Sequence, residues 1–314
     1  MTHFAKNAMV PLKDKTETIL RICKLIGSGH QGDVYLAYDM TDQCYVAAKH
    51  CYGDFVSDRK KFYEKLKILA DHPSPSPRLC WPKKVGAMTE NHTFLFTMPL
   101  VEGYRPFTDL ITNEDPVTDR QKAQILKQAG EVMQILYANK YIFTDLSATN
   151  LLYRIFPDGS VDVRFIDCDN ITQPGLSLGV EGSGKYRAPE LLIPSPNRLD
   201  GLPDPPSLSS DAFAFYVLAF RVLMRRHPLD GKLSRTKRWD DHEGFLEFYG
   251  RRPRFIFDGD ENAPSDNIVK KWLNLPKEMK AIFRLGFSQK SLKDKTARPP
   301  VQALVACLEE AYSL

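Results

Sequence analysis

Residues 27–34 read Gly27-Ser28-Gly29-His30-Gln31-Gly32-Asp33-Val34, with three glycines in the pattern G-x-G-x-x-G. Strand-like runs of apolar residues flank this stretch, at 19–26 before it and 34–38 after it. Because both flanks have the pattern of β-strands, we expect the glycines to form the turn of a β-hairpin. The same glycine pattern joins a strand to a helix in dinucleotide-binding folds, and these flanks do not favour that arrangement.

A further strand pattern ends in a lysine, in the run Val46-Ala47-Ala48-Lys49. Residues 57–69 then have the pattern of a helix with apolar positions at 62, 66 and 69. Glu64 is the acid inside this segment. Taken alone, the local pattern favours an exposed Glu64 on a solvated helix face, because glutamate is common there.

Two polar segments in the second half of the chain carry candidate metal ligands. Asp145 and Asn150 follow a long amphipathic segment in the spacing D-x-x-x-x-N-L-L. Asp167 ends a strand-like run that begins at Val163. Carboxylate and amide oxygens are the ligands that hard divalent cations prefer. Each acid alone fits a polar turn, but the order and spacing of all these segments together favour one site.

In this order, the segments resemble those of a eukaryotic-type (Hanks-type) Ser/Thr protein kinase domain. Residues 182–190 resemble its G-T-x-x-Y-x-A-P-E segment, and residues 209–215 resemble its central buried helix. Arg298-Pro299 resembles its late R-P motif, and the resemblance implies that this arginine pairs with Glu190. The resemblance covers about residues 19–312. It implies an α+β bilobal kinase fold, with a small β-rich lobe that has one helix and a larger helical lobe. The expected divisions are an extension at 1–18, the N-lobe at 19–98, a hinge at 99–103 and the C-lobe at 104–314.

The resemblance also implies a role for each matching residue. Asp145 would orient the acceptor hydroxyl, with Lys49 and Glu64 as the phosphate clamp and its partner. Asn150 and Asp167 would bind Mg²⁺, with Mn²⁺ as an alternative metal. Ser183 would lie beside Asp145. ATP would contact a set of residues from the glycine hairpin, the neighbouring strands and the hinge, namely Gly27, Gly29, Gly32, Val34, Ala47, Lys49, Met98, Pro99 and Val101.

The implied function is transfer of the γ-phosphate of Mg-ATP to Ser or Thr hydroxyls, including autophosphorylation. Thr144 stands where the family has the arginine of His-Arg-Asp, so we expect activity without activation-loop phosphorylation. A pseudokinase that acts as a nucleotide-binding scaffold is the second class, and the departures that count for it are Phe143, Thr144, Cys168 and Asp169. Ser147 stands where the family has a lysine that contacts the γ-phosphate, so we expect a lower turnover. A small-molecule phosphotransferase is a third class, which the A-P-E segment and Arg298 disfavour.

Composition sets the remaining expectations. A net charge of +4 gives no reason to expect nucleic acid, and six scattered cysteines indicate a reducing, cytoplasmic location. No apolar run is long enough to span a bilayer. A basic cluster between Arg235 and Arg254 could dock an acidic partner. Residues 220–231 are similar to a stretch of bacterial kinases encoded with von Willebrand A-type partners, so the expected substrate is an unidentified partner protein.

Overall fold

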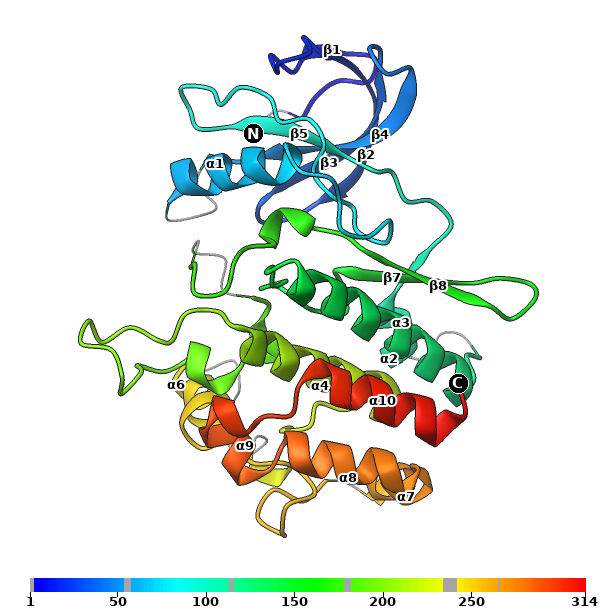
Figure 1. Ribbon diagram of the computed structural model, residues 1–314, viewed down its shortest axis with the longest axis vertical. Coiled ribbons are helices and arrows are strands. Elements are labelled where there is room, and N and C mark those ends of the chain that lie inside the picture. The colour runs from blue at the N-terminus through cyan, green and yellow to red at the C-terminus, as the bar shows by residue number, and fades with distance from the viewer. Residues whose placement is uncertain (1–2, 54–57, 113–115, 178–181, 234–241, 265) are drawn as a thin grey trace. The chain divides into compact units, whose positions relative to one another are not determined.

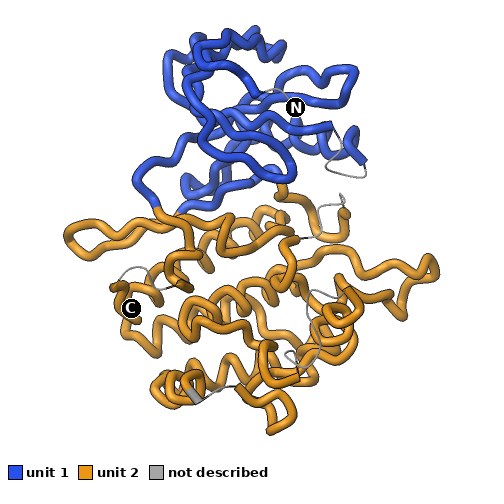
Figure 2. The backbone as a smooth tube through the Cα atoms, turned by 180° about the vertical axis from the view of Figure 1, so that it is seen from behind, with its two compact units in different colours: residues 1–104, 164–169, 178–180 blue, residues 105–163, 170–177, 181–314 orange. Residues whose placement is uncertain are grey.

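The structure is a computed structural model that describes residues 3–53, 58–112, 116–177, 182–233, 242–264 and 266–314 (Figure 1). The chain divides into two compact units, which Figure 2 shows in different colours. Unit 1 contains residues 1–104, 164–169 and 178–180. Unit 2 contains residues 105–163, 170–177 and 181–314. The α+β division into a strand-rich unit and a helical unit agrees with the sequence prediction.

Unit 1 is built on an antiparallel sheet in the order β1-β2-β3-β4-β5. The strands are β1 (Met9–Pro11), β2 (Ile19–Ser28), β3 (Gly32–Asp39), β4 (Cys44–Cys51) and β5 (Phe94–Met98). Alternate residues of β2, β3 and β4 are buried in one apolar cluster, which includes Leu20, Tyr35 and Ala48. Strand β1 lies inside the segment 1–18, so part of the predicted extension belongs to this sheet.

The helix of unit 1 is α1 (Arg59–Ala70). Its first turn is capped by Asp58, whose side chain accepts a hydrogen bond from the Lys61 amide. At the other end, the Trp81 indole N–H donates to the carbonyl of Leu69 at 2.8 Å, which satisfies a backbone group that the helix leaves open. The buried stripe of α1 consists of Phe62, Lys65, Leu66 and Leu69.

Unit 2 is mainly helical. Helix α4 (Leu208–Met224) is its most buried element, and α10 (Val301–Tyr312) packs against α3 (Asp119–Ala138), α4 and α8 (Lys277–Gly286). Capping boxes at Thr118 and Ser207 start α3 and α4. The shorter elements are α2 (Phe107–Thr112), α6 (His242–Phe245), α7 (Asp266–Asn274), α9 (Gln289–Lys293) and the small sheet of β6 (Arg105–Pro106), β7 (Leu151–Ile155) and β8 (Val161–Phe165).

A buried histidine follows α4. The Nδ1 atom of His227 accepts a hydrogen bond from the Leu229 amide at 3.1 Å, so its Nε2–H donates to the Lys185 carbonyl at 2.9 Å. Burial lowers the pKa of His227 from 6.5 to about 4, against the attraction of Asp230. The imidazole is therefore neutral in the folded protein at pH values where the unfolded chain already binds a proton.

This burial predicts an acid-sensitive fold. Between pH 6.5 and pH 4 the unfolded state binds a proton at His227 that the folded state does not, so stability falls as pH falls. One proton contributes a slope of up to about 1.4 kcal/mol per pH unit. Urea unfolding gives the free energy of unfolding at pH 5 and at pH 7, and the difference between these two values should be smaller for His227→Gln than for the unchanged protein. The control His72→Gln, at an exposed histidine, should have the same difference as the unchanged protein. Equal differences in the His227→Gln and unchanged proteins would contradict this assignment.

Candidate active site

The glycine stretch forms a β-hairpin, as the sequence predicts, with Gly27 in β2, Gly29 in the turn and Gly32 at the start of β3. Strand β2 ends at Ser28 and β3 begins at Gly32, and the Gly29 amide donates to the Gly32 carbonyl at 3.0 Å. A Cβ atom at Gly32 would lie 2.1 Å from the His50 carbonyl oxygen, so only glycine lets β4 approach β3 this closely.

Residues predicted to bind the nucleotide share one face of the sheet of unit 1. In the strand register, Val34 lies opposite both Gly27 and Lys49, and Ala47 lies opposite Met98. Directly paired residues and residues two apart on a strand point to the same face. Ala47, Lys49 and Met98 are buried there, and Val34 is half-buried. The remaining residues of the predicted set follow β5 and are half-buried, namely Pro99 and Val101.

Lys49 lies in a buried cluster of charges. Its Nζ atom is 2.8 Å from Oδ2 of Asp169 and 3.2 Å from Oδ1 of Asp167, and it donates to Oε1 of Gln31 at 3.1 Å. Burial acts to lower the pKa of Lys49, but Asp169 and Asp167 outweigh it and raise the pKa above its ordinary value. Lys49 is therefore a fixed positive charge on the inner face of the sheet.

The position of Asp167 depends on backbone hydrogen bonds of nearby Phe165 and on the strained conformation of Asp167 itself. The Phe165 amide donates to the Arg78 carbonyl at 2.9 Å, and the Cys80 amide donates to the Phe165 carbonyl at 2.8 Å. Two residues further on, Asp167 has a φ of 54°, in the left-handed region that costs energy for any residue other than glycine. Strained residues of this kind cluster at functional sites.

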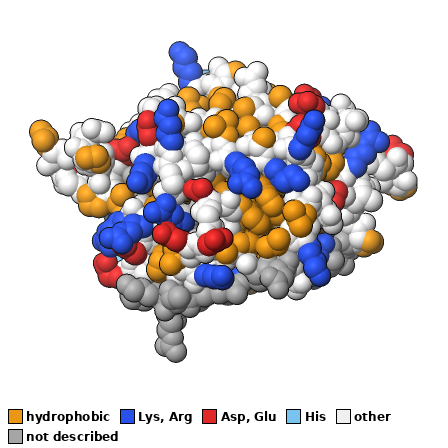
Figure 3. Space-filling view, turned by 90° about the horizontal axis from the view of Figure 1, so that it is seen from below, with side chains coloured by type: hydrophobic (Ala, Val, Ile, Leu, Met, Phe, Trp, Pro, Cys, Tyr) orange, Lys and Arg blue, Asp and Glu red, His pale blue; other side chains and the backbone are white. Residues whose placement is uncertain are grey.

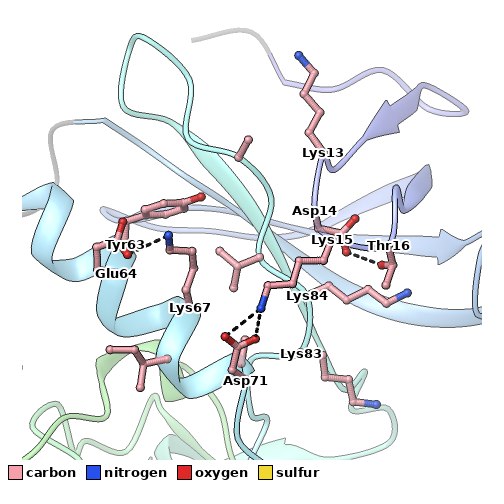
Figure 4. Close-up of a pocket in the computed structure, with 14 residues that line it drawn as sticks. Lys13, Asp14, Lys15, Thr16, Tyr63, Glu64, Lys67, Asp71, Lys83 and Lys84 are labelled. Carbon is pink, nitrogen blue, oxygen red and sulfur yellow. Dashed lines mark hydrogen bonds and ion pairs between the residues drawn. The ribbon is translucent and has the colours of Figure 1, made fainter.

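The structure does not bring Glu64 to Lys49. Its carboxylate pairs with Lys67 at 2.9 Å, and 51% of its side chain is exposed. Figure 4 shows this pair at a pocket of about 550 Å³ that is also bordered by residues 13–16 and 83–87. The reason is helical periodicity: the apolar positions 62, 66 and 69 place residue 65, not 64, in the buried stripe. The same periodicity in the sequence was the signal that could have identified Lys65.

We therefore expect the substitution Glu64→Gln to have little effect. It removes a half-exposed ion pair between residues one helical turn apart, and such a pair contributes about 0.5 kcal/mol or less. Nucleotide affinity and phosphoryl transfer should stay within about twofold of the unchanged protein, since half a kcal/mol corresponds to about that factor. A loss of tenfold or more in kcat/KM for ATP would show that Glu64 reaches Lys49 during the reaction.

The second group of predicted site residues lies in unit 2. Nδ2 of Asn150 donates to the backbone carbonyl of Asp145 at 2.8 Å and to its Oδ2 at 3.0 Å. The Ser183 hydroxyl donates to the other carboxylate oxygen, Oδ1, at 2.7 Å. Both oxygens of Asp145 are thus held by named partners, and the pairing with Ser183 agrees with the resemblance. Such a carboxylate is oriented to accept or direct a proton.

Backbone and hydroxyl contacts fix the loop that carries Asp145. The Phe143 amide donates to Oδ2 of Asp211 on α4 at 2.6 Å, and the Thr144 hydroxyl donates to the Asn170 carbonyl at 2.8 Å. Burial raises the pKa of Asp211 to about 7, although the bond from Phe143 opposes this shift. Gly182 has a φ of 78°, and a Cβ atom there would lie 2.9 Å from the Thr144 carbonyl oxygen. The loop is therefore packed closely against the segment that carries Ser183.

The sequence also predicts an ion pair between Arg298 and Glu190, which the structure confirms. The two guanidinium nitrogens of Arg298 donate to the two carboxylate oxygens of Glu190 at 2.9 and 3.1 Å. The Arg298 side chain is only 1% exposed, and it also donates to the Ser209 and Ser291 carbonyls. This bidentate pair connects residues 188–192 to the segment that immediately precedes α10.

Comparison with known proteins identifies the family. A family model described as "Protein kinase domain" matches residues 20–296. The chain belongs to the protein kinase family. It is similar to serine/threonine-protein kinase PknA of Mycobacterium tuberculosis (26% identical, covering 67% of this chain and 48% of the relative). It is also similar to serine/threonine-protein kinase PknD of Chlamydia caviae (25%, covering 66% and 24%) and of Chlamydia pneumoniae (25%, covering 83% and 28%). The chain therefore spans about half the length of PknA and about a quarter of PknD.

Two predicted metal ligands of this kinase chain, one in each unit, carry donor atoms of the chemistry that a divalent metal takes. Asp167 offers a carboxylate that is 31% exposed, and Asn150 offers an amide oxygen. Both are hard oxygen ligands of the kind that Mg²⁺ takes with phosphate oxygens and water. Among the described residues, no group of three or more His, Cys, Asp and Glu side chains forms a metal site.

The basic cluster of this kinase chain is partly neutralised. Arg251 pairs with Glu243 at 3.0 Å, and Arg252 pairs with Glu247 at 3.2 Å. Figure 3, which views the molecule from the end where α7 and α8 lie, shows Lys and Arg side chains interspersed with acidic and hydrophobic ones. Arg254 lies 3.9 Å from Glu261. Three members of the predicted cluster, Arg235, Lys237 and Arg238, lie outside the described residues, so the acidic partner stays a prediction. Within the described ranges, no helix has the length and apolar character needed to cross a membrane.

Proposed function

We propose that this chain transfers the γ-phosphate of ATP to Ser or Thr hydroxyls of proteins, including its own. One observation supports this proposal above the others: Asn150 and Ser183 hold the two carboxylate oxygens of Asp145. A pseudokinase has no need for a carboxylate oriented in this way. The Arg298–Glu190 pair supports a protein acceptor, since in the family this segment builds the peptide-docking part of the domain.

In the proposed reaction, the acceptor hydroxyl oxygen attacks the γ-phosphorus and forms the new P–O bond. The bond between the γ-phosphorus and the β–γ bridging oxygen breaks, and ADP leaves with the electron pair. Asp145 orients the hydroxyl and takes its proton. Lys49 binds phosphate oxygens through its ammonium. A divalent cation, with Mg²⁺ as the proposed metal, supplies neutralisation of phosphate charge when Asp167 and Asn150 hold it.

We also propose that activity is independent of activation-loop phosphorylation. Thr144 replaces the arginine that would bind a phosphate, and its hydroxyl instead donates to the Asn170 carbonyl. Main-chain bonds between Ile142 and Thr172 hold the start of the same segment, at 2.8 and 3.1 Å. These contacts order the described parts of the loop without a phosphate group. Ser147, in place of the family's lysine, leaves one positive charge fewer near the γ-phosphate, so we expect modest turnover.

The test uses γ-labelled ATP with Mg²⁺, on the protein before and after phosphatase treatment. The expected result is label on Ser or Thr, located by mass spectrometry, at equal rates in both samples. Label that needs prior phosphorylation would contradict independence from the loop. Absence of label, together with a melting temperature raised by Mg-ATP, would favour the pseudokinase. Label on an added aminoglycoside or similar small molecule, with none on protein, would favour a small-molecule phosphotransferase.

A von Willebrand A-type partner and a cytoplasmic location stay predictions.

A further inference from the structure

The interior of unit 1 holds two lysines, and helix α1 contributes one of them. Lys65 is 9% exposed, and its ammonium lies 4.5 Å from the centre of the Phe62 ring and donates to the backbone carbonyl of Asp169. Lys49 is the other lysine, on β4. Burial lowers the pKa of Lys65 to about 7, against the attraction of Asp169, whereas the pKa of Lys49 is raised. The Lys49 ammonium therefore needs a carboxylate nearby, because an uncompensated buried charge is strongly destabilising.

Asp169 supplies the closest compensating charge. Its Oδ2 atom is 2.8 Å from Nζ of Lys49, and the two side chains are 0% and 4% exposed. Asp167 lies further from the same nitrogen, at 3.2 Å, and is 31% exposed. Because solvent screens a buried pair much less than an exposed one, the Asp169 carboxylate interacts more strongly with Lys49 than Asp167 does.

Helix α1 has no acid available for this purpose. Glu64 is the one acid between Arg59 and Ala70, and it pairs with Lys67 on the outer side of the helix. The contact from α1 to the cluster is instead made by Lys65, through the main chain of Asp169. Helix α1 therefore contributes a lysine to the cluster, and the loop after β8 contributes the carboxylate that contacts Lys49.

We propose that Asp169 is the positioning residue for Lys49, in the place of an acid on α1. The inference rests on the proposed function, because it concerns the same nucleotide site. Asp169 acts through Lys49: it fixes the position of the ammonium, so that the ammonium meets the nucleotide phosphates without reorganisation. Lys65 holds the backbone of Asp169 so that its carboxylate faces Lys49.

The test compares nucleotide binding by four proteins: the unchanged chain, Asp169→Asn, Asp169→Asn with Lys65→Glu, and Leu66→Ala. The first variant removes the charge and keeps the shape. The second returns a carboxylate to the cluster from α1 and removes the second lysine. Leu66→Ala is the matched control, because it leaves a cavity on the same buried stripe of α1 and lowers stability without changing a charge. The readouts are the Kd for a non-hydrolysable ATP analogue with Mg²⁺ and the melting temperature without nucleotide.

We expect Asp169→Asn to raise the Kd about tenfold or more, because the variant loses one partner of a buried charge pair and leaves the other partner buried. The double variant should recover to within about threefold of the unchanged protein, since the two changes are coupled through Lys49. Leu66→Ala should lower the melting temperature and leave the Kd unchanged. KM for ATP should follow the Kd in every variant, with a smaller change in kcat.

Several results would overturn the assignment. They are an unchanged Kd in Asp169→Asn, a double variant no better than the single one, or a loss that raised Mg²⁺ fully restores, which would make Asp169 a metal ligand. In each of these cases the unchanged protein still binds the analogue, so the proposed function survives. If the unchanged protein binds no ATP analogue, the proposed function fails and this assignment fails with it.

Discussion

Asp145→Asn should reduce phosphoryl transfer by about 10²- to 10⁴-fold, the usual contribution of a positioned acid or base. The amide has the shape of the carboxylate, so the contacts with Asn150 and Ser183 change little in geometry. The variant loses the negative charge that orients the acceptor hydroxyl. It also loses the oxygen atom that takes the proton of this hydroxyl. The rate of label transfer from γ-labelled ATP, at saturating ATP, measures this loss directly.

A matched control separates this chemistry from the general effect of losing an acid. Asp158→Asn removes an exposed carboxylate from the turn between β7 and β8, and it should leave transfer unchanged. The melting temperature and the affinity for a non-hydrolysable ATP analogue should be similar in both variants and the unchanged protein. If Asp145→Asn keeps more than a tenth of the rate, the carboxylate is not the group that acts on the acceptor hydroxyl.

Glu190→Gln should be the most damaging single change to the stability of unit 2. It leaves the buried Arg298 guanidinium without its carboxylate, and breaking a buried pair in this way costs about 3–5 kcal/mol. The loss should be at the low end, because Arg298 keeps its bonds to the Ser209 and Ser291 carbonyls. Urea unfolding, with equal slopes for the variant and the unchanged protein, gives the free energy difference.

Two further variants identify the origin of this loss. Arg298→Leu combined with Glu190→Gln should cost less than the sum of the two single changes, because neither partner is then left buried and charged. Asp71→Asn breaks the exposed Lys15–Asp71 pair and should cost about 1 kcal/mol or less. A cost of the same size for Glu190→Gln would show that the Arg298–Glu190 pair contributes no more than a surface ion pair.

Much of the site follows from sequence spacing, because its contacts are short-range along the chain. The glycine hairpin depends on residues within one turn of two paired strands, and the pattern of its flanks was enough to predict it. Asp145 and Asn150 are five residues apart in one loop, so their hydrogen bonds are local as well. Ser183 and the Arg298–Glu190 pair are not local, and they were predicted only because the order of the motifs resembles a known family.

The sequence by itself determined the family and the two-part α+β fold, and it predicted the residues of the site, since these depend on local patterns and their order. The tertiary structure alone decided which charge holds Lys49. Choosing between Glu64 and Asp169 requires knowing which face of α1 is buried and where the chain after β8 passes. A helix that turns by about 100° per residue exposes position 64 when position 65 is buried. Long-range packing sets the rotation of α1 about its axis, and no single sequence motif predicts it.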